Sequence, residues 1–228
     1  MNLITENRLA RRAAIMESAR QMIAEKGYEA ITIRELAEAC RVSVPTLYNQ
    51  FGRKDQLLAA AIEDHFVREP GQDSIKTNLI GLDRIFAIFD FITNQFLEAP
   101  AFHRRLLEAF GSLDSVQQVQ RSITESLAHE ITCELSGMQQ RKELAPWVDV
   151  ELLAGQVTTA FVSSTILWGS GGIKENQLTA SVQYGTGLVL SGVVAGESAA
   201  LTGRILAAQE LLGDSTNHGQ PATKELTS

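Results

Sequence analysis

Two helix starts lie eleven residues apart near the N-terminus, and they constrain the fold more than any other feature of the sequence. Thr32 is followed by Glu35, the capping-box pattern in which a hydroxyl and a carboxylate satisfy free amides of a first helical turn. Ser43 offers a second N-cap, and Pro45 falls in the first turn, where a missing amide hydrogen costs little. The pattern therefore predicts two short helices joined by a tight turn, ending at Gly52.

Apolar residues elsewhere recur at helical spacing, and no stretch alternates as a strand does. The linker EPGQDS at 69–74 divides a short helical module from a longer series of helical patterns. The tail after residue 213 is polar and low in aromatic residues. The sequence predicts an all-α fold with a helix-turn-helix domain at 1–68, a larger helical domain at 69–213 and a disordered tail at 214–228.

Charge divides unevenly between these parts. The chain has a net charge of -7 and a pI of about 5.2, which argues against a nucleic-acid binder when taken alone. Residues 1–58 nevertheless hold nine Lys/Arg against seven Asp/Glu, whereas residues 69–228 hold ten against eighteen. Attraction to phosphate depends on the local patch, so DNA binding by the first part stays open.

No constellation of residues predicts catalysis, a cofactor or a metal ion. The sequence contains no glycine-rich phosphate loop, nucleophile elbow or paired carboxylates. We find no partner at ligand spacing for His65, His103, His129 or His218, and we expect Cys40 and Cys133 to be small buried residues in helices. The expectation is a non-enzymatic protein without cofactor or metal.

A cytoplasmic location is expected. The N-terminus lacks the apolar segment of a signal peptide. The most apolar run, GLVLSGVVAG at 187–196, falls far short of the ~20 residues that span a bilayer.

The second of two such helices commonly enters the major groove of DNA with its N-terminal residues facing bases and phosphates. Hydroxyls at 43, 46 and 48 and an amide at 49 suit phosphate oxygens and base edges, although capping alone would explain Ser43. Val44 and Pro45 could contact thymine methyl groups.

The run KGYEAITIRELAEACRVSVPTLYNQFGRKDQLL at 26–58, with its core VSxxTLYxxFxxKxxLL, resembles the DNA-binding domain of the TetR (tetracycline-repressor) family. The strong match covers about a fifth of the chain. The resemblance implies DNA contacts from the second helix, the recognition helix and the start of the fourth, at Thr32, Arg34, Ser43, Val44, Pro45, Thr46, Tyr48, Asn49 and Lys54. Gln50, Arg53 and Pro45 depart from what is frequent in the family, and Pro45 could alter the base sequence that is read.

The resemblance also implies that the second domain binds a small molecule and dimerises. We expect an apolar ligand pocket lined by helical aromatic residues with two polar residues, although ordinary core packing would explain each one; they are Phe86, Phe89, Gln95, Phe96, Phe110, Gln156, Phe161 and Trp168. Small residues within the stretch 179–196 predict a close helix contact between subunits, or tight packing inside one subunit. The expected interface residues are Val157, Gly185, Ser191, Gly192, Ala195 and Gly196.

These expectations add up to a ligand-responsive transcriptional regulator, most simply a repressor, that binds a palindromic operator in double-stranded DNA as a homodimer. A small, mostly apolar effector would release it. Two alternatives stay open at this point: an activator of the same family, and a helical small-molecule carrier with a vestigial DNA-binding module.

Overall fold

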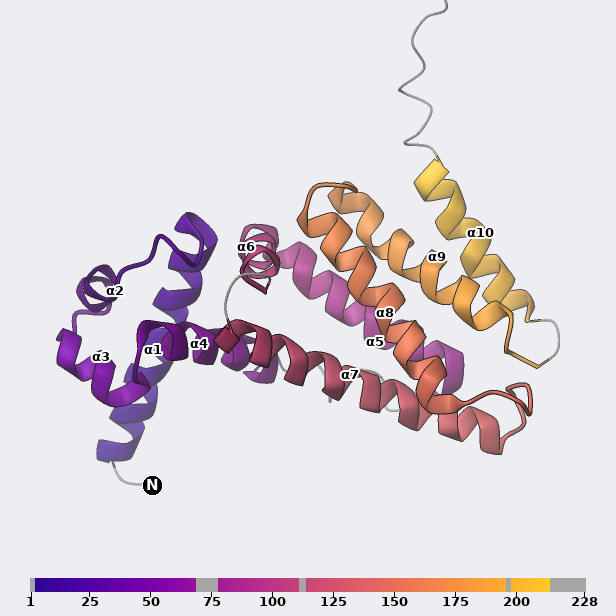
Figure 1. The fold of residues 1–228 in the computed structure, drawn as a ribbon, viewed down its shortest axis with the longest axis horizontal. Helices are drawn as coiled ribbons and strands as arrows, with labels where there is room; N and C mark the ends of the chain where they lie inside the picture. Colours follow the sequence, from indigo (N-terminus) through magenta and orange to yellow (C-terminus); the bar gives the residue numbers. More distant parts are fainter. Residues whose placement is uncertain (1–2, 69–77, 111–113, 196–197, 214–228) are drawn as a thin grey trace, which may run out of the picture.

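The computed structural model describes residues 3–68, 78–110, 114–195 and 198–213, and the regular elements among them are helices (Figure 1). They are α1 (Leu3–Lys26), α2 (Ile33–Ala39), α3 (Val44–Phe51), α4 (Lys54–Arg68), α5 (Gly81–Glu98), α6 (Pro100–Phe110), α7 (Asp114–Gln140), α8 (Val150–Gly169), the 3-10 helix η1 (Glu175–Gln177), α9 (Leu178–Ser191) and α10 (Ala199–Gly213). The predicted all-α class is confirmed. The predicted linker 69–74 and tail 214–228 lie outside the described residues.

Both predicted helix starts are present. The Thr32 hydroxyl accepts a hydrogen bond from the Glu35 amide at 3.2 Å, and the Glu35 carboxylate accepts one from the Thr32 amide at 3.0 Å. The Ser43 hydroxyl accepts a hydrogen bond from the Thr46 amide at 3.3 Å. Between α2 and α3 the chain turns at Arg41, which has a positive φ of 53°. The caps and the turn together give the helix-turn-helix.

Helices α1 to α4 surround one cluster of buried side chains. Leu47 of α3 is fully buried in this cluster. The guanidinium of Arg12 lies 4.7 Å from the ring centre of Phe51 and joins α1 to α3, while Arg20 pairs with Asp64 at 3.1 Å and joins α1 to α4. α3 therefore packs against α1 and α4.

Helices α5, α7, α8, α9 and α10 surround a second cluster. Within it, α8 and α9 run antiparallel in close contact. The Ser181 hydroxyl donates to the Ser164 hydroxyl at 3.0 Å, and a Cβ on Gly185 would lie 3.6 Å from Ala160 Cβ. Ser181 thus lies opposite Ser164, and Gly185, four residues later on α9, lies opposite Ala160, four residues earlier on α8. The small side chains at both places let the two helices approach closely.

Helix α6 belongs to both halves of the molecule and lies between them (Figure 1). Phe102 and Leu106 are buried in the cluster of α1 to α4, although the sequence assigned them to the second domain. His103, the residue after Phe102, stacks on Phe96 of the second cluster with the two ring centres 4.4 Å apart. The predicted domain boundaries stay a prediction, but α6 joins the two cores.

The expected helical stretch 179–196 is shorter than predicted. α9 ends at Ser191, and the chain after it pairs with the segment before α8. The Ala145 amide donates to the Val193 carbonyl at 2.8 Å, and the Ala195 amide donates to the Glu143 carbonyl at 2.8 Å. Two consecutive β-branched residues after Gly192 favour this extended pairing over a helix. Ala195 therefore lies beyond the helix on which it was placed.

Candidate functional site

Helix α3 buries one side and exposes the other. Leu47 and Phe51 face the core, whereas Pro45, Tyr48 and Asn49 are exposed. Tyr48 has 49% of its surface accessible, which is high for a large aromatic side chain. The sequence predicted that Pro45, Tyr48 and Asn49 point outward, and all three are exposed on the outer side of α3.

The two hydroxyls at the start of α3 form a local pair. Ser43 Oγ and Thr46 Oγ1 lie 2.8 Å apart, and either can be the donor. Ser43 is exposed, and Val44 and Thr46 are partly exposed. Since one hydroxyl donates to the other, one O–H of the pair is left for an outside acceptor such as a phosphate. Ser43 therefore serves as an N-cap, as the sequence analysis allowed, and the pair still has one O–H that can donate a hydrogen bond.

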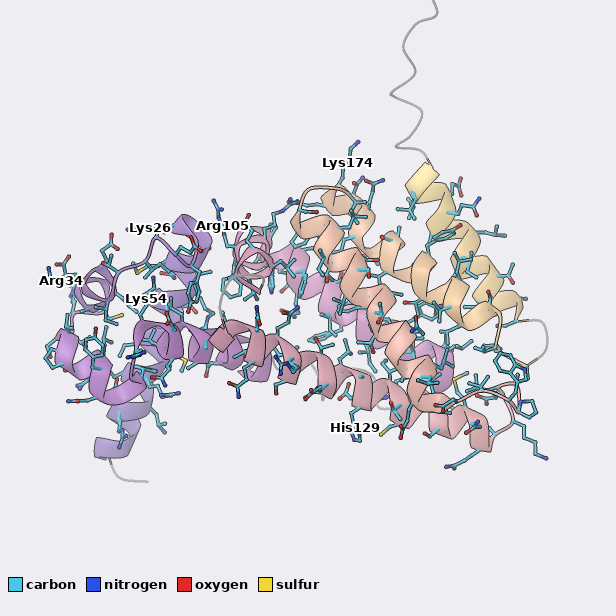
Figure 2. All side chains as sticks on the ribbon, viewed as in Figure 1. Lys26, Arg34, Lys54, Arg105, His129 and Lys174 are labelled. Atoms are coloured by element: carbon cyan, nitrogen blue, oxygen red, sulfur yellow. The ribbon has the colours of Figure 1, made fainter. Side chains whose placement is uncertain are left out.

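The α2 residues differ from each other in availability. The Thr32 hydroxyl donates to Glu35 at 2.9 Å as well as accepting from its amide, so its hydrogen is already used. Arg34 is exposed at the outer end of the N-terminal half (Figure 2), and no ion pair forms at its guanidinium within the described residues. Arg34 is the more available donor of the two.

Lys54, expected at the start of the fourth helix, is engaged within the molecule. Its Nζ donates to the Glu29 carbonyl at 3.1 Å and lies 5.5 Å from the centre of the Tyr28 ring. This contact ties the start of α4 to the turn between α1 and α2. An ammonium group has three N–H donors, so the hydrogen bond to Glu29 leaves further donors on Lys54.

Glu35 has the strongest electrostatic perturbation near this surface. A hydrogen bond from Lys26, whose Nζ lies 2.8 Å away, and hydrogen bonds from the Thr32 amide and hydroxyl together lower the pKa of Glu35 to about 2. The same contact raises the pKa of Lys26. The cap of α2 thus depends on an ionised carboxylate.

The aromatic residues expected around a ligand pocket pack against one another in the second cluster. Phe89 stacks on Phe161 with ring centres 4.9 Å apart, and Phe96 lies 6.0 Å from Trp168. Arg204 of α10 covers Phe86 at 4.9 Å. All five aromatic side chains are buried. Their use as a pocket lining stays a prediction, and the side chain of Phe110 lies outside the described residues.

The two polar residues of that expectation differ in position. Gln95 is partly buried, whereas Gln156 is exposed on α8 and does not face the aromatic cluster, because it lies on the outer side of the helix. A hollow of about 220 Å³ lies instead between α7 and α8, lined by small residues that include Thr124, Gly155 and Thr158. A larger hollow of about 430 Å³ lies between the α1–α2 turn and α6, and Lys26 and Arg105 face it.

In the second half of the molecule, three interior polar atoms carry no hydrogen bond among the described residues: Thr158 Oγ1, Trp168 Nε1 and Thr186 Oγ1. Trp168 and Thr186 are fully buried, and Thr158 is 3% exposed. Buried polar groups are nearly always paired, so these three need an explanation. Periodicity places a residue on a buried face but cannot show whether its polar atom finds a partner.

The predicted dimer-interface residues are divided. Val157 is fully buried in the protomer's own core and Gly185 faces α8, so both serve packing within one chain. Ser191, Gly192 and Ala195 are exposed, and Gly196 lies outside the described residues. What the sequence missed is a set of exposed large apolar residues on α8 and α9, namely Leu152, Ile166, Leu167 and Leu188.

The expectation that Cys133 is a buried residue is wrong. His129 and Cys133 lie one helical turn apart on α7, with Nε2 and Sγ 3.9 Å from each other, and Cys133 is exposed rather than buried. The i, i+4 spacing was visible in the sequence. His103 is buried with its Nδ1 3.0 Å from the Ala99 carbonyl, whereas the side chain of His65 and all of His218 lie outside the described residues.

Residues 15–61 match the profile described as bacterial regulatory proteins, tetR family. The chain is 25% identical over 163 residues to the HTH-type transcriptional repressor KstR of Rhodococcus jostii, covering 69% of this chain and 72% of that protein. It is 46% identical over 54 residues to the HTH-type transcriptional repressor AcnR of Corynebacterium efficiens, covering 23% of this chain and 29% of that protein.

Solved structures share the fold at low identity. The regulator FadR of Bacillus subtilis, in complex with stearoyl-CoA, superimposes with a TM-score of 0.66 at 19% identity over 79% of this chain and 98% of its own. The repressor FadR of Thermus thermophilus, in complex with lauroyl-CoA, gives 0.61 at 18% identity over 82% and 97%. Residues 15–61 thus match the DNA-binding domain of the TetR family of bacterial transcriptional regulators, and the chain as a whole shares its fold with regulators of that family.

Proposed function

We propose that the protein is a transcriptional repressor that binds a palindromic operator as a homodimer and is released by a small, mostly apolar effector. The observation that carries this proposal is the outward surface of α3, where Pro45, Tyr48 and Asn49 are exposed while Leu47 and Phe51 hold the helix to the core. Repression is the sign we favour over activation because KstR and AcnR are both named repressors.

DNA contacts divide into positioning and reading. Arg34 and the free O–H of the Ser43–Thr46 pair suit phosphate oxygens, which fix the position of the protein but carry no sequence information. Tyr48 adds a third group for the backbone, and Lys54 a fourth through its spare N–H donors. Asn49 and Pro45 are the exposed side chains suited to base edges and thymine methyl groups. The Thr32 hydroxyl already donates to Glu35, so we rank Thr32 last among the predicted phosphate contacts.

The dimer would form over α8 and α9. α8 is long and apolar enough to cross a membrane, yet only 39% of its apolar stretch is buried in the protomer. Leu152 is 71% exposed, and Ile166 and Leu167 are about half exposed on the same helix. We infer that a second chain covers these exposed apolar side chains. A second copy covering them would bury these residues and set two α3 helices about a twofold axis.

The effector would enter the second half of the molecule. The aromatic cluster supplies apolar contacts, and Trp168 Nε1 and Thr186 Oγ1 are buried polar atoms for which a bound molecule could supply the missing hydrogen bond. Both FadR structures contain acyl-CoA thioesters. Long-chain acyl thioesters are therefore the first class of effector to test.

Helix α6 offers a route from the effector to DNA. Its Phe102 and Leu106 lie in the core of α1 to α4, while His103 stacks on Phe96 of the second core. A shift of the aromatic cluster would move α6 and with it the DNA-binding half. To change operator occupancy from 99:1 to 1:99, the effector needs about 5.5 kcal/mol of preference for the released state.

The test is selection of bound sequences from a random duplex DNA pool by the purified full chain. We expect an inverted repeat, because a symmetric dimer presents the same α3 surface twice. A Tyr48→Ala/Asn49→Ala variant with unchanged circular dichroism should recover no motif. If the wild-type dimer also recovers none at moderate salt, the carrier hypothesis replaces this one.

The effector is tested separately by adding palmitoyl-CoA, or coenzyme A alone as control, to the complex of protein and selected DNA. We expect release by the thioester and none by coenzyme A. Retention of DNA with both compounds would exclude acyl thioesters while leaving DNA binding untouched.

A further inference from the structure

One pair of chemically reactive side chains lies far from the DNA-facing surface. His129 and Cys133 are both exposed on α7, and Figure 2 shows His129 projecting away from the other helices. The four-residue spacing places both side chains on one face of the helix, one above the other. Their nearest approach is between Nε2 and Sγ, which are 3.9 Å apart.

This distance is close to what one metal ion requires of two ligands. Zinc binds thiolate sulfur at about 2.3 Å and imidazole nitrogen at about 2.0–2.1 Å, so at a tetrahedral angle the two atoms stand about 3.6 Å apart. The two side chains need to move by only a few tenths of an ångström, and α7 need not change its backbone. Thiolate and imidazole are also the ligand types that zinc and similar ions prefer.

The surroundings favour a cation and leave its other positions open. Glu125, one turn before His129, and Glu130, next to it, add negative charge on this part of α7. No group of three or more His, Cys, Asp or Glu side chains that could hold a metal ion occurs in the parts of the chain that the structure describes. Water or a second molecule would therefore complete the coordination.

We propose that His129 and Cys133 form a two-ligand surface site for a single Zn²⁺-like transition-metal ion. Nε2 of neutral His129 donates one lone pair, and Cys133 binds as thiolate after releasing its proton to solvent. The alternative is a weak contact between thiol and imidazole with no affinity for metal. The proposal does not depend on DNA binding or on the effector.

Cobalt(II) is the probe, because its thiolate complexes give a charge-transfer absorption in the near ultraviolet that oxygen and nitrogen ligands do not. The full chain, without an affinity tag and reduced by a non-thiol reagent, is titrated with CoCl₂. We expect this absorption to saturate at one cobalt per chain and to disappear when ZnCl₂ is added. No thiolate absorption at excess cobalt would overturn the proposal.

Four variants separate the pair from other sources of binding. Cys133→Ser should abolish the absorption, while Cys40→Ser, which changes the other thiol, should leave it intact. His129→Gln should weaken cobalt binding by about a hundredfold, because a lone ligand loses the gain from linking two. The decisive variant is Glu125→His/His129→Gln, which keeps one imidazole on the same face but two turns, about 12 Å, from Cys133. If this variant binds cobalt as wild type does, the pair is not the site.

Discussion

Arg34 is exposed on α2, and no ion pair engages its guanidinium among the residues that the structure describes. We expect Arg34→Ala to weaken operator binding and to reduce the slope of log K against log salt by about 0.9, since one phosphate contact is lost. Titrations at several salt concentrations, followed by fluorescence anisotropy, measure this slope.

A matched control is Arg204→Ala, which removes an equally charged residue from α10, where it pairs with Asp83. Its effect on the salt slope should be close to zero. Equal slopes for Arg34→Ala and wild type would show that Arg34 does not contact phosphate.

Glu35 makes the N-terminal half sensitive to acid. Its folded pKa of about 2 lies below that of an unfolded glutamate. The stabilisation is therefore fully present above the unfolded pKa of about 4.3 and is lost as the pH falls from there toward 2. We expect Glu35→Gln to flatten this part of the dependence of unfolding free energy on pH, measured by urea denaturation. Unchanged pH dependence in the variant would contradict the assignment.

For single residues, the helix caps could be predicted from the sequence, whereas the direction in which a helical side chain points could not. The caps at Thr32 and Ser43 depend on residues three positions away, so the sequence contains all of their determinants. Val157, predicted at a subunit interface, is buried in the protomer, and Gln156, predicted to line a pocket, is exposed. Neighbours on a helix differ by about 100° in direction, so a small error in the assumed face exchanges buried and exposed positions.

Within α9, two glycines predict opposite results. A Cβ on Gly185 would meet Ala160 Cβ at 3.6 Å, an ordinary contact, whereas a Cβ on Gly187 would lie 2.6 Å from Ile205 Cγ1. We expect Gly185→Ala to raise the free energy of unfolding by up to about 1 kcal/mol, through helix propensity. Gly187→Ala should lower it by about 1–3 kcal/mol, because Ile205 is stiff and must shift.

Urea denaturation of both variants at one protein concentration checks this pair. A destabilised Gly185→Ala would mean that the α8–α9 contact is tighter than the structure has it, or that Gly185 also meets a second chain. The same measurement thus tests the assignment of Gly185 to packing within the protomer.

The helices themselves were largely predictable, and their ends were less so. Apolar spacing fixed where α5, α7 and α8 run, because each buries a regular stripe. The end of α9 was misplaced because the sequence stays largely apolar to residue 195, whereas the chain after Ser191 pairs with the segment before α8, as between Val193 and Ala145. That pairing joins segments about fifty residues apart, which periodicity within one helix cannot detect.

For the whole molecule, Leu152 tests the dimer. Leu152→Glu would place a charge in the proposed α8 interface, where burying it without a partner is costly. We expect the variant to be monomeric at micromolar concentration in light scattering, with unchanged helix content. Leu9→Glu, on α1 and also well exposed in the protomer, should leave a dimer. A dimeric Leu152→Glu would move the interface away from this part of α8.

The joint at α6 could not have been predicted from composition or spacing. The linker at 69–74 suggested a clean division, yet Phe102 and Leu106 complete the core of the preceding helices. Contacts of this kind form between segments that no local pattern relates. Under the proposed function they matter because they connect the effector-binding half with the helices that hold α3.

Hydroxyl-radical footprinting of the selected operator tests most directly whether α3 is presented to DNA as one of a symmetric pair. We expect two protected clusters on one face of the duplex, centred about 10–10.5 base pairs, or 34–36 Å, apart or at a multiple of that spacing. If a folded dimer protects only one cluster of nucleotides, or none, α3 is not presented to DNA as one of a symmetric pair.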